Sequence, residues 1–430
     1  MAVIWVLLVL LLGLFSIQFM KLRQAAALLP PGPTPLPLIG NLFTIKFQLH
    51  HRTLMKLSEI YGNIMTIWVG QTPLIVVSGY ETVKHCLIDN SEQVSNRPTT
   101  PYFKYYAENQ GIIFSNGHNW KLQRRLGLKI LRNLGFGKKG LEWRIKKEAC
   151  HLVEVFVSQK GSATDPNSCI MNAVSNVMTA VNFGHTYSLK DKFFHHIIDS
   201  SDVVGNFYGT HWGQVKDDPA STISEGNLVR VLMDLLLAGS ETVTSTLKWG
   251  LLYMAIYQDV QVKVQKEIDA FVESIENLQY EDRIKMPYTN AVIHEVQRFS
   301  NVAPVGLPRQ CTQDIKLNEY SIRKGSIVIA NLASVLTEPK HWKFPDTFNP
   351  SNFLDEEENF QSNKAFVPFS AGHRICMGEQ MARTELFIFF TSLLKTLSFH
   401  LPKGVTEVNL NGIFGTTFKP HPYQICAIPR

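Results

Sequence analysis

The chain has little cysteine and no long run of charges of one sign. Its six cysteines are spread over 430 residues at wide, irregular spacings, which fit neither a disulfide scaffold nor a paired zinc motif. We therefore expect reduced thiols in a domain that faces the cytosol. The net charge is +6, and the basic residues are interspersed with apolar ones. This pattern argues against a nucleic-acid partner and is compatible with an acidic protein docking on a local basic face.

Charge is absent from the amino terminus. The run from Ala2 to Met20 is apolar and long enough to cross a bilayer as a helix, so we predict a transmembrane anchor over residues 1–20. Lys21 and Arg23 follow the run, which by the positive-inside rule leaves the rest of the chain in the cytosol. The alternative is a signal peptide cleaved near Ala25 to Ala27, but such a peptide carries its positive charge before the apolar run.

The remainder reads as a proline-rich hinge over residues 21–40 and a mostly helical domain over residues 41–430. Two β-rich runs within residues 65–78 predict a hairpin, and a third lies at Ser326 to Ile329. We expect a single mainly α domain with a small β-sheet region. Helices are predicted over Trp120 to Asn133, Leu141 to Val157, Asn227 to Tyr253, Val260 to Val272 and Thr289 to Phe299.

One glycine-rich segment matches a dinucleotide-binding fingerprint letter for letter, from Gly135 to Gly140. That fingerprint binds pyrophosphate only where it follows a strand and opens a helix. Here it follows the helical stretch that contains Trp120, so a turn between two helices is the better interpretation. With no other nicotinamide or flavin site visible, redox chemistry would need electrons from another protein.

A lone cysteine, Cys376, lies at the start of a predicted helix, where backbone N–H groups and the helix dipole favour a thiolate. A thiolate can bind iron, although a cysteine in a turn is more often a buried structural residue. The pattern Phe-x-x-Gly-x-Arg-x-Cys-x-Gly, which begins at Phe369, resembles the haem-binding loop of cytochromes P450 at every fixed position. The resemblance implies haem b as cofactor, Cys376 as the axial ligand of the iron, and Phe369, Arg374 and Gly378 as further cofactor-binding residues.

A second segment resembles the Glu-x-x-Arg motif of the same superfamily. Glu295 and Arg298 lie three residues apart on a predicted helix, where they can pair and support a nearby loop. Asn352 stands where the family often has Arg or His, in a segment that joins this pair. The resemblance therefore implies a structural role for Glu295 and Arg298, with a weaker clamp at Asn352.

The long helix from Asn227 to Tyr253 is apolar almost all round, which predicts burial through the centre of the fold. A glycine, two hydroxyls and an acid interrupt it from Ala238 to Thr242. One explanation is a kink at a helix crossing, with a threonine hydroxyl bonded back to a carbonyl. The resemblance implies the other, an oxygen-activation motif in which Thr242 and Glu241 are catalytic and assist proton delivery.

Haem carries two propionates, for which arginine is the natural partner. The resemblance implies that Trp120, Arg124, Arg309 and Arg374 fill this role. The helix that carries the first two of these also has a basic face that suits an acidic electron donor, although a merely solvated face is an equal alternative. That face consists of Lys121, Arg125, Lys129 and Arg132.

The resemblance covers nearly the whole chain but leaves one gap. Between Arg124 and Asn227 the chain is roughly sixty residues too short for the helices that the family places there. Trp212 resembles the early part of the substrate roof, yet the central helix follows almost at once. We therefore expect a cytochrome P450 fold with an N-terminal transmembrane helix that lacks several helices near 205–225. A shortened roof would weaken substrate binding and admit water to the reaction site.

The detail is most similar to microsomal family-two members, including the fatty-acid epoxygenase, J-type branch. This implies an endoplasmic reticulum enzyme that inserts one oxygen atom from O₂ into a fatty acid or xenobiotic. Electrons would come from NADPH through NADPH-cytochrome P450 reductase, with cytochrome b5 as a further donor. The alternatives are a truncated, inactive haem-binding or misfolded variant and, if the amino terminus is cleaved, a secreted haem carrier.

Overall fold

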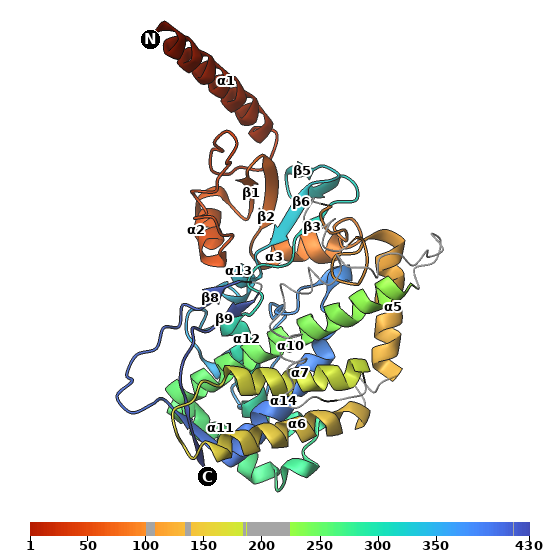
Figure 1. Cartoon of the computed structure of the whole chain (residues 1–430). Helices are drawn as coiled ribbons and strands as arrows, with labels where there is room; N and C mark the ends of the chain where they lie inside the picture. Colours follow the sequence, from red (N-terminus) through yellow and green to blue (C-terminus); the bar gives the residue numbers. More distant parts are fainter. Residues whose placement is uncertain (100–107, 134–138, 184–185, 187–223, 416) are drawn as a thin grey trace. The chain divides into compact units, whose positions relative to one another are not determined.

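The computed structural model describes every residue except 100–107, 134–138, 184–185, 187–223 and 416 (Figure 1). Its α-helices are α1 Ala2–Ala26, α2 His51–Tyr61, α3 Tyr80–Lys84, α5 Gly117–Asn133, α6 Lys139–Ser158, α7 Asn167–Phe183, α10 Glu225–Ile256, α11 Gln258–Phe271, α12 Pro287–Ser300, α13 Leu332–Leu336 and α14 Glu379–Thr396. Its strands are β1 Ile64–Val69, β2 Thr72–Val77, β3 Arg309–Gln310, β4 Ile315–Leu317, β5 Tyr320–Ile322, β6 Ile327–Ala330, β7 Leu397–His400, β8 Ile413–Phe414, β9 Phe418–Lys419 and β10 Cys426–Pro429. The predicted fold class, mainly α with a small β region, is confirmed.

The chain forms two compact units, each built from separate stretches. The first comprises Met1–Pro98, Ala303–His341 and Ala365–Ile375, and the second comprises Thr99–Val302, Trp342–Lys364 and Cys376–Arg430. The boundary at Ile375 falls inside the cysteine motif. The residues predicted to bind the cofactor are therefore distributed over both units.

The first unit contains a four-stranded sheet in the order β1-β2-β6-β3. The predicted hairpin is confirmed, since β1 pairs antiparallel with β2. The predicted third run forms β6, which lies parallel to β2 and is buried along its whole length, as expected of a central apolar strand. At the edge, β3 pairs with β6 and thereby fixes the position of Arg309.

The proline-rich segment is hydrogen-bonded to the edge strand β1 of this sheet. Thr66 of β1 donates hydrogen bonds to the carbonyls of Pro30 and Pro31, both at 2.8 Å. A Cβ on Gly32 would lie 2.0 Å from the Thr66 carbonyl oxygen, so this close approach requires glycine. The segment predicted as a spacer thus continues into the globular part.

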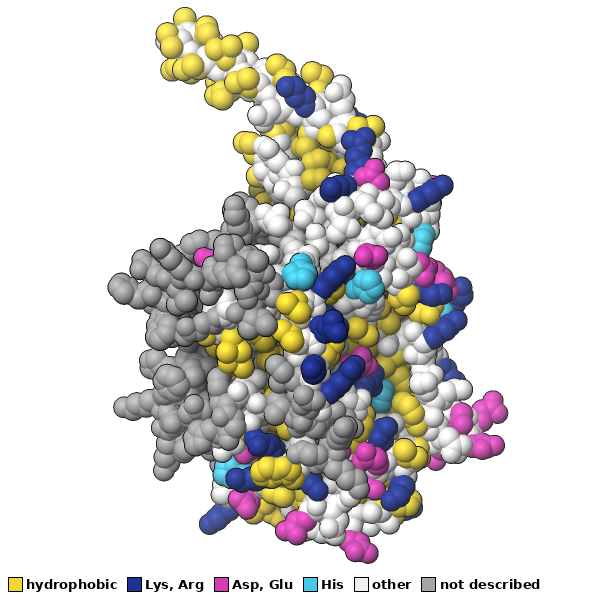
Figure 2. All heavy atoms as spheres, turned by 90° about the vertical axis from the view of Figure 1, so that its right-hand side faces the viewer, with side chains coloured by type: hydrophobic (Ala, Val, Ile, Leu, Met, Phe, Trp, Pro, Cys, Tyr) yellow, Lys and Arg dark blue, Asp and Glu magenta, His cyan; other side chains and the backbone are white. Residues whose placement is uncertain are grey.

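None of the residues of α1 is buried, and the helix is long and apolar enough to cross a membrane. Figure 2 shows apolar side chains wrapping this N-terminal helix and basic side chains toward its end. This arrangement matches the predicted anchor.

In the second unit the core forms around α10, whose Trp249 and Tyr253 are almost completely buried. The helix α7 packs along α10 at Gly239, where a Cβ would lie 2.5 Å from the sulfur of Met178 (Figure 1). The contact with Met178 explains why glycine stands at this position of α10.

The apolar run Leu386 to Leu394, which is too short to span a membrane, is buried within α14.

The five predicted helices are confirmed as α5, α6, α10, α11 and α12, each slightly longer than expected. The segment Gly135 to Gly140 joins α5 to α6, although its residues 134–138 lie outside the described part of the chain. A helix therefore precedes it, as the rejection of a dinucleotide site required. The roof segment near 205–225 falls almost wholly outside the described residues, which resume at Ser224, the N-cap of α10.

Candidate functional site

Cys376 differs from the other five cysteines, all of which are described and free of disulfides, because it alone is exposed. Its sulfur is nevertheless closely surrounded by protein. This desolvation raises the pKa of Cys376, while the backbone N–H groups of Gly378 and Glu379 and the charge of Arg124 lower it. By contrast, burial raises the pKa of Cys86, as of two other cysteines, to about 12. Cys376 is thus the cysteine that can reach a ligand and has hydrogen-bond donors for a thiolate.

The loop before the cysteine has a backbone that only glycine permits. Gly372 has a φ of +72°, and a Cβ there would lie 1.7 Å from the carbonyl oxygen of Leu87. The next N–H group, of His373, donates to the Ser91 hydroxyl at 2.6 Å. The glycine of the sequence motif is therefore explained by a close backbone approach.

Two arginines that were predicted to bind the cofactor form hydrogen bonds that fix this loop. Arg309 is buried and donates to the Ser370 hydroxyl at 3.0 Å and to the Ala371 carbonyl at 2.9 Å. Arg374 is also buried and donates through Nε to the Ser95 carbonyl at 2.6 Å. Phe369 is half-buried in the same loop. These contacts fix the loop and leave the propionate role a prediction.

Trp120 and Arg124 lie one turn apart on α5, and Trp120 is buried. Burial lowers the pKa of Arg124, and the nearby thiol of Cys376 opposes this shift. The structure therefore brings Arg124 within electrostatic range of Cys376, although the two are far apart in the sequence.

The predicted basic face of α5 is exposed at all four positions, Lys121, Arg125, Lys129 and Arg132.

Glu241 and Thr242 have separate partners. The Thr242 hydroxyl donates to the Ala238 carbonyl at 2.7 Å, which is the back-bonded arrangement expected of a structural threonine. Glu241 accepts from the Thr417 hydroxyl at 3.0 Å and from Lys419 at 3.3 Å. Neither Thr417 nor Lys419 was predicted, because both lie more than 170 positions away in the sequence.

Glu295 and Arg298 form a fully buried bidentate pair, with both N···O distances at 2.7 Å. Arg298 also donates to the carbonyls of three loop residues, 344, 345 and 347. Asn352 donates to both Glu295 oxygens, at 3.2 and 3.3 Å, and bonds the backbone of Phe344 in both directions. Asn352 therefore joins the Glu295–Arg298 network through a neutral amide.

A second network escaped the sequence reasoning. Arg383 of α14 donates through Nε and Nη2 to Glu379, and its Nη1 lies 2.8 Å from Nε2 of His294 on α12. Because arginine can only donate, His294 accepts at Nε2 and its Nδ1–H donates to the Asn290 carbonyl. The i,i+4 spacing of Glu379 and Arg383 was visible in the sequence, whereas the link to His294 was not. This chain of contacts ties the helix that follows Cys376 to the helix of the Glu295–Arg298 pair.

A family model described as "Cytochrome P450" matches the chain over residues 30–217 and 198–427. Among curated relatives, "Cytochrome P450 2J2" of Homo sapiens is 36% identical to this chain. The alignment covers 97% of this chain and 94% of the length of the relative. "Cytochrome P450 2J5" of Mus musculus is 35% identical with the same coverage. "Cytochrome P450 2K1" of Oncorhynchus mykiss is 36% identical over 93% of this chain and 92% of its own.

The same comparisons bear on the length of the chain. The alignment with the human relative spans 476 positions against 430 residues here, so at least 46 positions have no counterpart in this chain. The family model matches in two pieces that overlap at residues 198–217. The break in the match therefore falls in the segment predicted to be shortened.

Haem b is the cofactor of this family, and the residues described here suit it. An accessible cysteine flanked by N–H donors fits a single axial thiolate ligand, and basic side chains fit two propionates. The motifs, the fold and the full-length matches agree. The chain therefore belongs to the cytochrome P450 family, within its family-2, J-like group.

Proposed function

We propose that this chain is a membrane-anchored monooxygenase that inserts one oxygen atom into a lipophilic substrate, a fatty acid or a xenobiotic. The observation that supports the proposal most is the environment of Cys376. This residue is exposed, its sulfur is largely shielded from water, and the backbone N–H groups of Gly378 and Glu379 donate hydrogen bonds to it. In this account Cys376 is the axial ligand of the haem iron. Electrons come from NADPH through NADPH-cytochrome P450 reductase, with cytochrome b5 as a second donor.

Bound haem would supply the iron that activates O₂. The residues that we propose for binding and orienting haem are Cys376, from the turn before α14, Trp120 and Arg124 of α5, Arg309 of β3 and Arg374 of the cysteine loop. Phe369 and Gly378 complete the cofactor-binding set.

Proton delivery is assigned to Thr242 and Glu241. Because the Thr242 hydroxyl donates a hydrogen bond to the Ala238 carbonyl, in this conformation its oxygen can only accept a hydrogen bond from another donor. To donate, Thr242 must rotate away from that carbonyl. Glu241 is held by Thr417 and Lys419, so we propose that it acts by exchanging the Thr417 hydrogen bond for water.

We place the protein in the endoplasmic reticulum membrane, with α1 as a single anchor and the residues that follow α1 in the cytosol. Support comes from the apolar helix and the basic residues that follow it. The exposed basic face of α5 is proposed as the reductase-docking surface.

The test is turnover of a fatty acid by the full chain in membranes with reductase and NADPH. We expect an oxygenated product from wild type and from Cys426→Ser, and none from Cys376→Ser. A product that persists in Cys376→Ser would contradict the assignment.

A second candidate is a haem-binding form that accepts electrons without oxygenating substrate. The gapped alignment and the two-piece family match favour it, because the shortened stretch is the one expected to cover the substrate. The two candidates differ in the ratio of product formed to NADPH consumed. A ratio near zero with steady NADPH oxidation would support the second candidate.

A further inference from the structure

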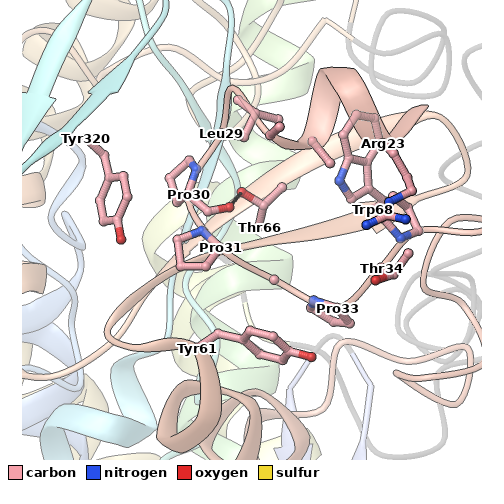
Figure 3. Close-up of a pocket in the computed structure, with 14 residues that line it drawn as sticks. Arg23, Leu29, Pro30, Pro31, Pro33, Thr34, Tyr61, Thr66, Trp68 and Tyr320 are labelled. Atoms are coloured by element: carbon pink, nitrogen blue, oxygen red, sulfur yellow. Dashed lines mark hydrogen bonds between the residues drawn. The ribbon is translucent and has the colours of Figure 1, made fainter. Parts of the chain in front are cut away.

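A cavity of about 470 Å³ lies in the first unit where α1 passes into the proline-rich hinge (Figure 3). Its walls come from three separate parts of the sequence: residues 23–35, which run from the end of α1 into the hinge, residues 61–68, which run from α2 into β1, and Tyr320 of β5. Figure 3 shows Arg23, Thr34 and Trp68 on one side of this space and Tyr320 on the other. We call it the hinge cavity. Nothing in the monooxygenase assignment uses it.

The position of the hinge cavity along the chain determines its depth in a membrane. If the uncharged stretch from Ala2 to Met20 spans the bilayer, Lys21 and Arg23 lie at the cytosolic headgroup layer. Arg23 lines the cavity from the last turns of the same helix. The cavity therefore opens at the height of the phosphates of that leaflet.

The chemistry of the walls suits a phosphate ester. Arg23 is exposed and cationic, and the exposed Thr34 adds a hydroxyl. The aromatic side chains of Tyr61, Trp68 and Tyr320 are of the kind enriched where membrane meets water. None of the 14 lining residues, all of them described, is acidic. The neighbouring Glu319 hydrogen-bonds Tyr320 and is not among them.

We propose that the hinge cavity binds the headgroup of an anionic phospholipid from the cytosolic leaflet, with its phosphate on Arg23. An anionic headgroup is favoured because Arg23 supplies a cation and none of the lining residues supplies a negative charge. The bound lipid would fix the angle between anchor and globular part. This inference rests on the proposed membrane anchoring and is independent of haem.

The experiment uses the full chain reconstituted in phosphatidylcholine vesicles that contain a minor fraction of phosphatidylserine. After flotation and mild detergent extraction, the phosphatidylserine retained per protein is quantified. Arg23→Gln is compared with Lys21→Gln, which removes the same charge from the same helix outside the cavity walls. We expect retention to fall about tenfold in Arg23→Gln and to stay at the wild-type level in Lys21→Gln.

Equal losses in the two variants would indicate general surface attraction and overturn the site. Inorganic phosphate at millimolar level tests the other source of the same chemistry: if it displaces the lipid fully, the site is a phosphate site and the lipid assignment is wrong. A wild-type chain that fails to float overturns the anchoring and the lipid site together. A chain that floats but retains no more phosphatidylserine than Arg23→Gln overturns the lipid site alone.

Discussion

At the scale of single residues, the buried pair Glu295–Arg298 can be compared with an exposed pair of the same i,i+3 spacing, Asp282–Lys285. Removing Arg298 leaves a buried carboxylate uncompensated and three loop carbonyls without their donor. We expect Arg298→Ala to lower the free energy of unfolding by about 3–5 kcal/mol, and Lys285→Ala by less than about 1 kcal/mol. Urea titration followed by tryptophan fluorescence measures both. Similar losses of unfolding free energy in the two variants would contradict a stabilising role for the buried Glu295–Arg298 pair.

His294 predicts a dependence of stability on pH. Burial, together with Arg383 and Arg283, lowers its pKa from 6.5 to about 3, so it stays neutral in the folded chain. The unfolded chain takes up a proton below about pH 6.5, and stability is therefore lost as pH falls from there toward 3. His294→Gln should flatten this dependence, whereas exposed His151→Gln should leave it unchanged. Urea midpoints near pH 7 and near pH 5 distinguish the two, and an unaltered slope in His294→Gln would refute the assignment.

Single residues also mark the limit of prediction from the sequence. The Glu295–Arg298 pair was predictable because helical spacing places its members on one face. The contacts of Asn352 could not be predicted: its amide donates to both oxygens of Glu295 and to the Phe344 carbonyl, which no local pattern reveals. In the same way, Glu241 was identified without its partner Lys419, since only the folded chain brings them together.

At the scale of elements, the loop before Cys376 depends on one backbone contact. Gly372→Ala would place a Cβ against the Leu87 carbonyl, a group that cannot move aside as a side chain can. Gly325→Ala is the matched control, because Gly325 also has a positive φ (+85°) but has nothing within 4 Å of the new atom. We expect a cost of roughly 1–2 kcal/mol for Gly325→Ala from backbone strain and a larger one for Gly372→Ala. Urea midpoints and haem content per chain measure the difference, and equal values would exclude the steric explanation.

The link between α12 and α14 gives a second prediction at this scale. Arg383 compensates Glu379, whose carboxylate lies near Cys376 and raises the pKa of that cysteine. Without Arg383 this negative charge acts on the metal site unopposed, so the haem-loaded Arg383→Gln should have a more negative reduction potential. Lys395→Gln, at the other end of α14, is the control. A potential unchanged in Arg383→Gln by redox titration would show that the link is structural only.

Helices with strong apolar periodicity were predictable from the sequence, and α5, α11 and α12 are examples. The helix α7 was not, because Asn, Ser and Thr interrupt its apolar positions. One of its buried polar residues, Asn176, finds its partner only in the folded chain, where it donates to Glu148. The hinge prolines predicted a stiff extended segment but not its hydrogen bonds to Thr66, which lies 36 positions away from Pro30.

At the scale of the whole molecule, the family, the fold class and the cysteine motif were all predictable, because ordered motifs at fixed distances specify them together. A shortfall before α10 is predicted from the length of that stretch, and the family model matches in two pieces that meet in the same part of the chain. The effect of that shortfall on the substrate region is a property of the assembled chain. Motifs cannot supply it, since they lie on either side of the stretch predicted to be short.

The central claim is that this chain assembles a haem–thiolate centre at Cys376. Its most direct test is the difference spectrum of the reduced, carbon-monoxide-bound protein in membranes, recorded for wild type, Cys376→Ser and Cys426→Ser. We predict a Soret band at the position diagnostic of thiolate-ligated haem in wild type and Cys426→Ser, and its absence in Cys376→Ser. Absence of that band from wild type, with the full-length chain present in the same membranes, would contradict the account.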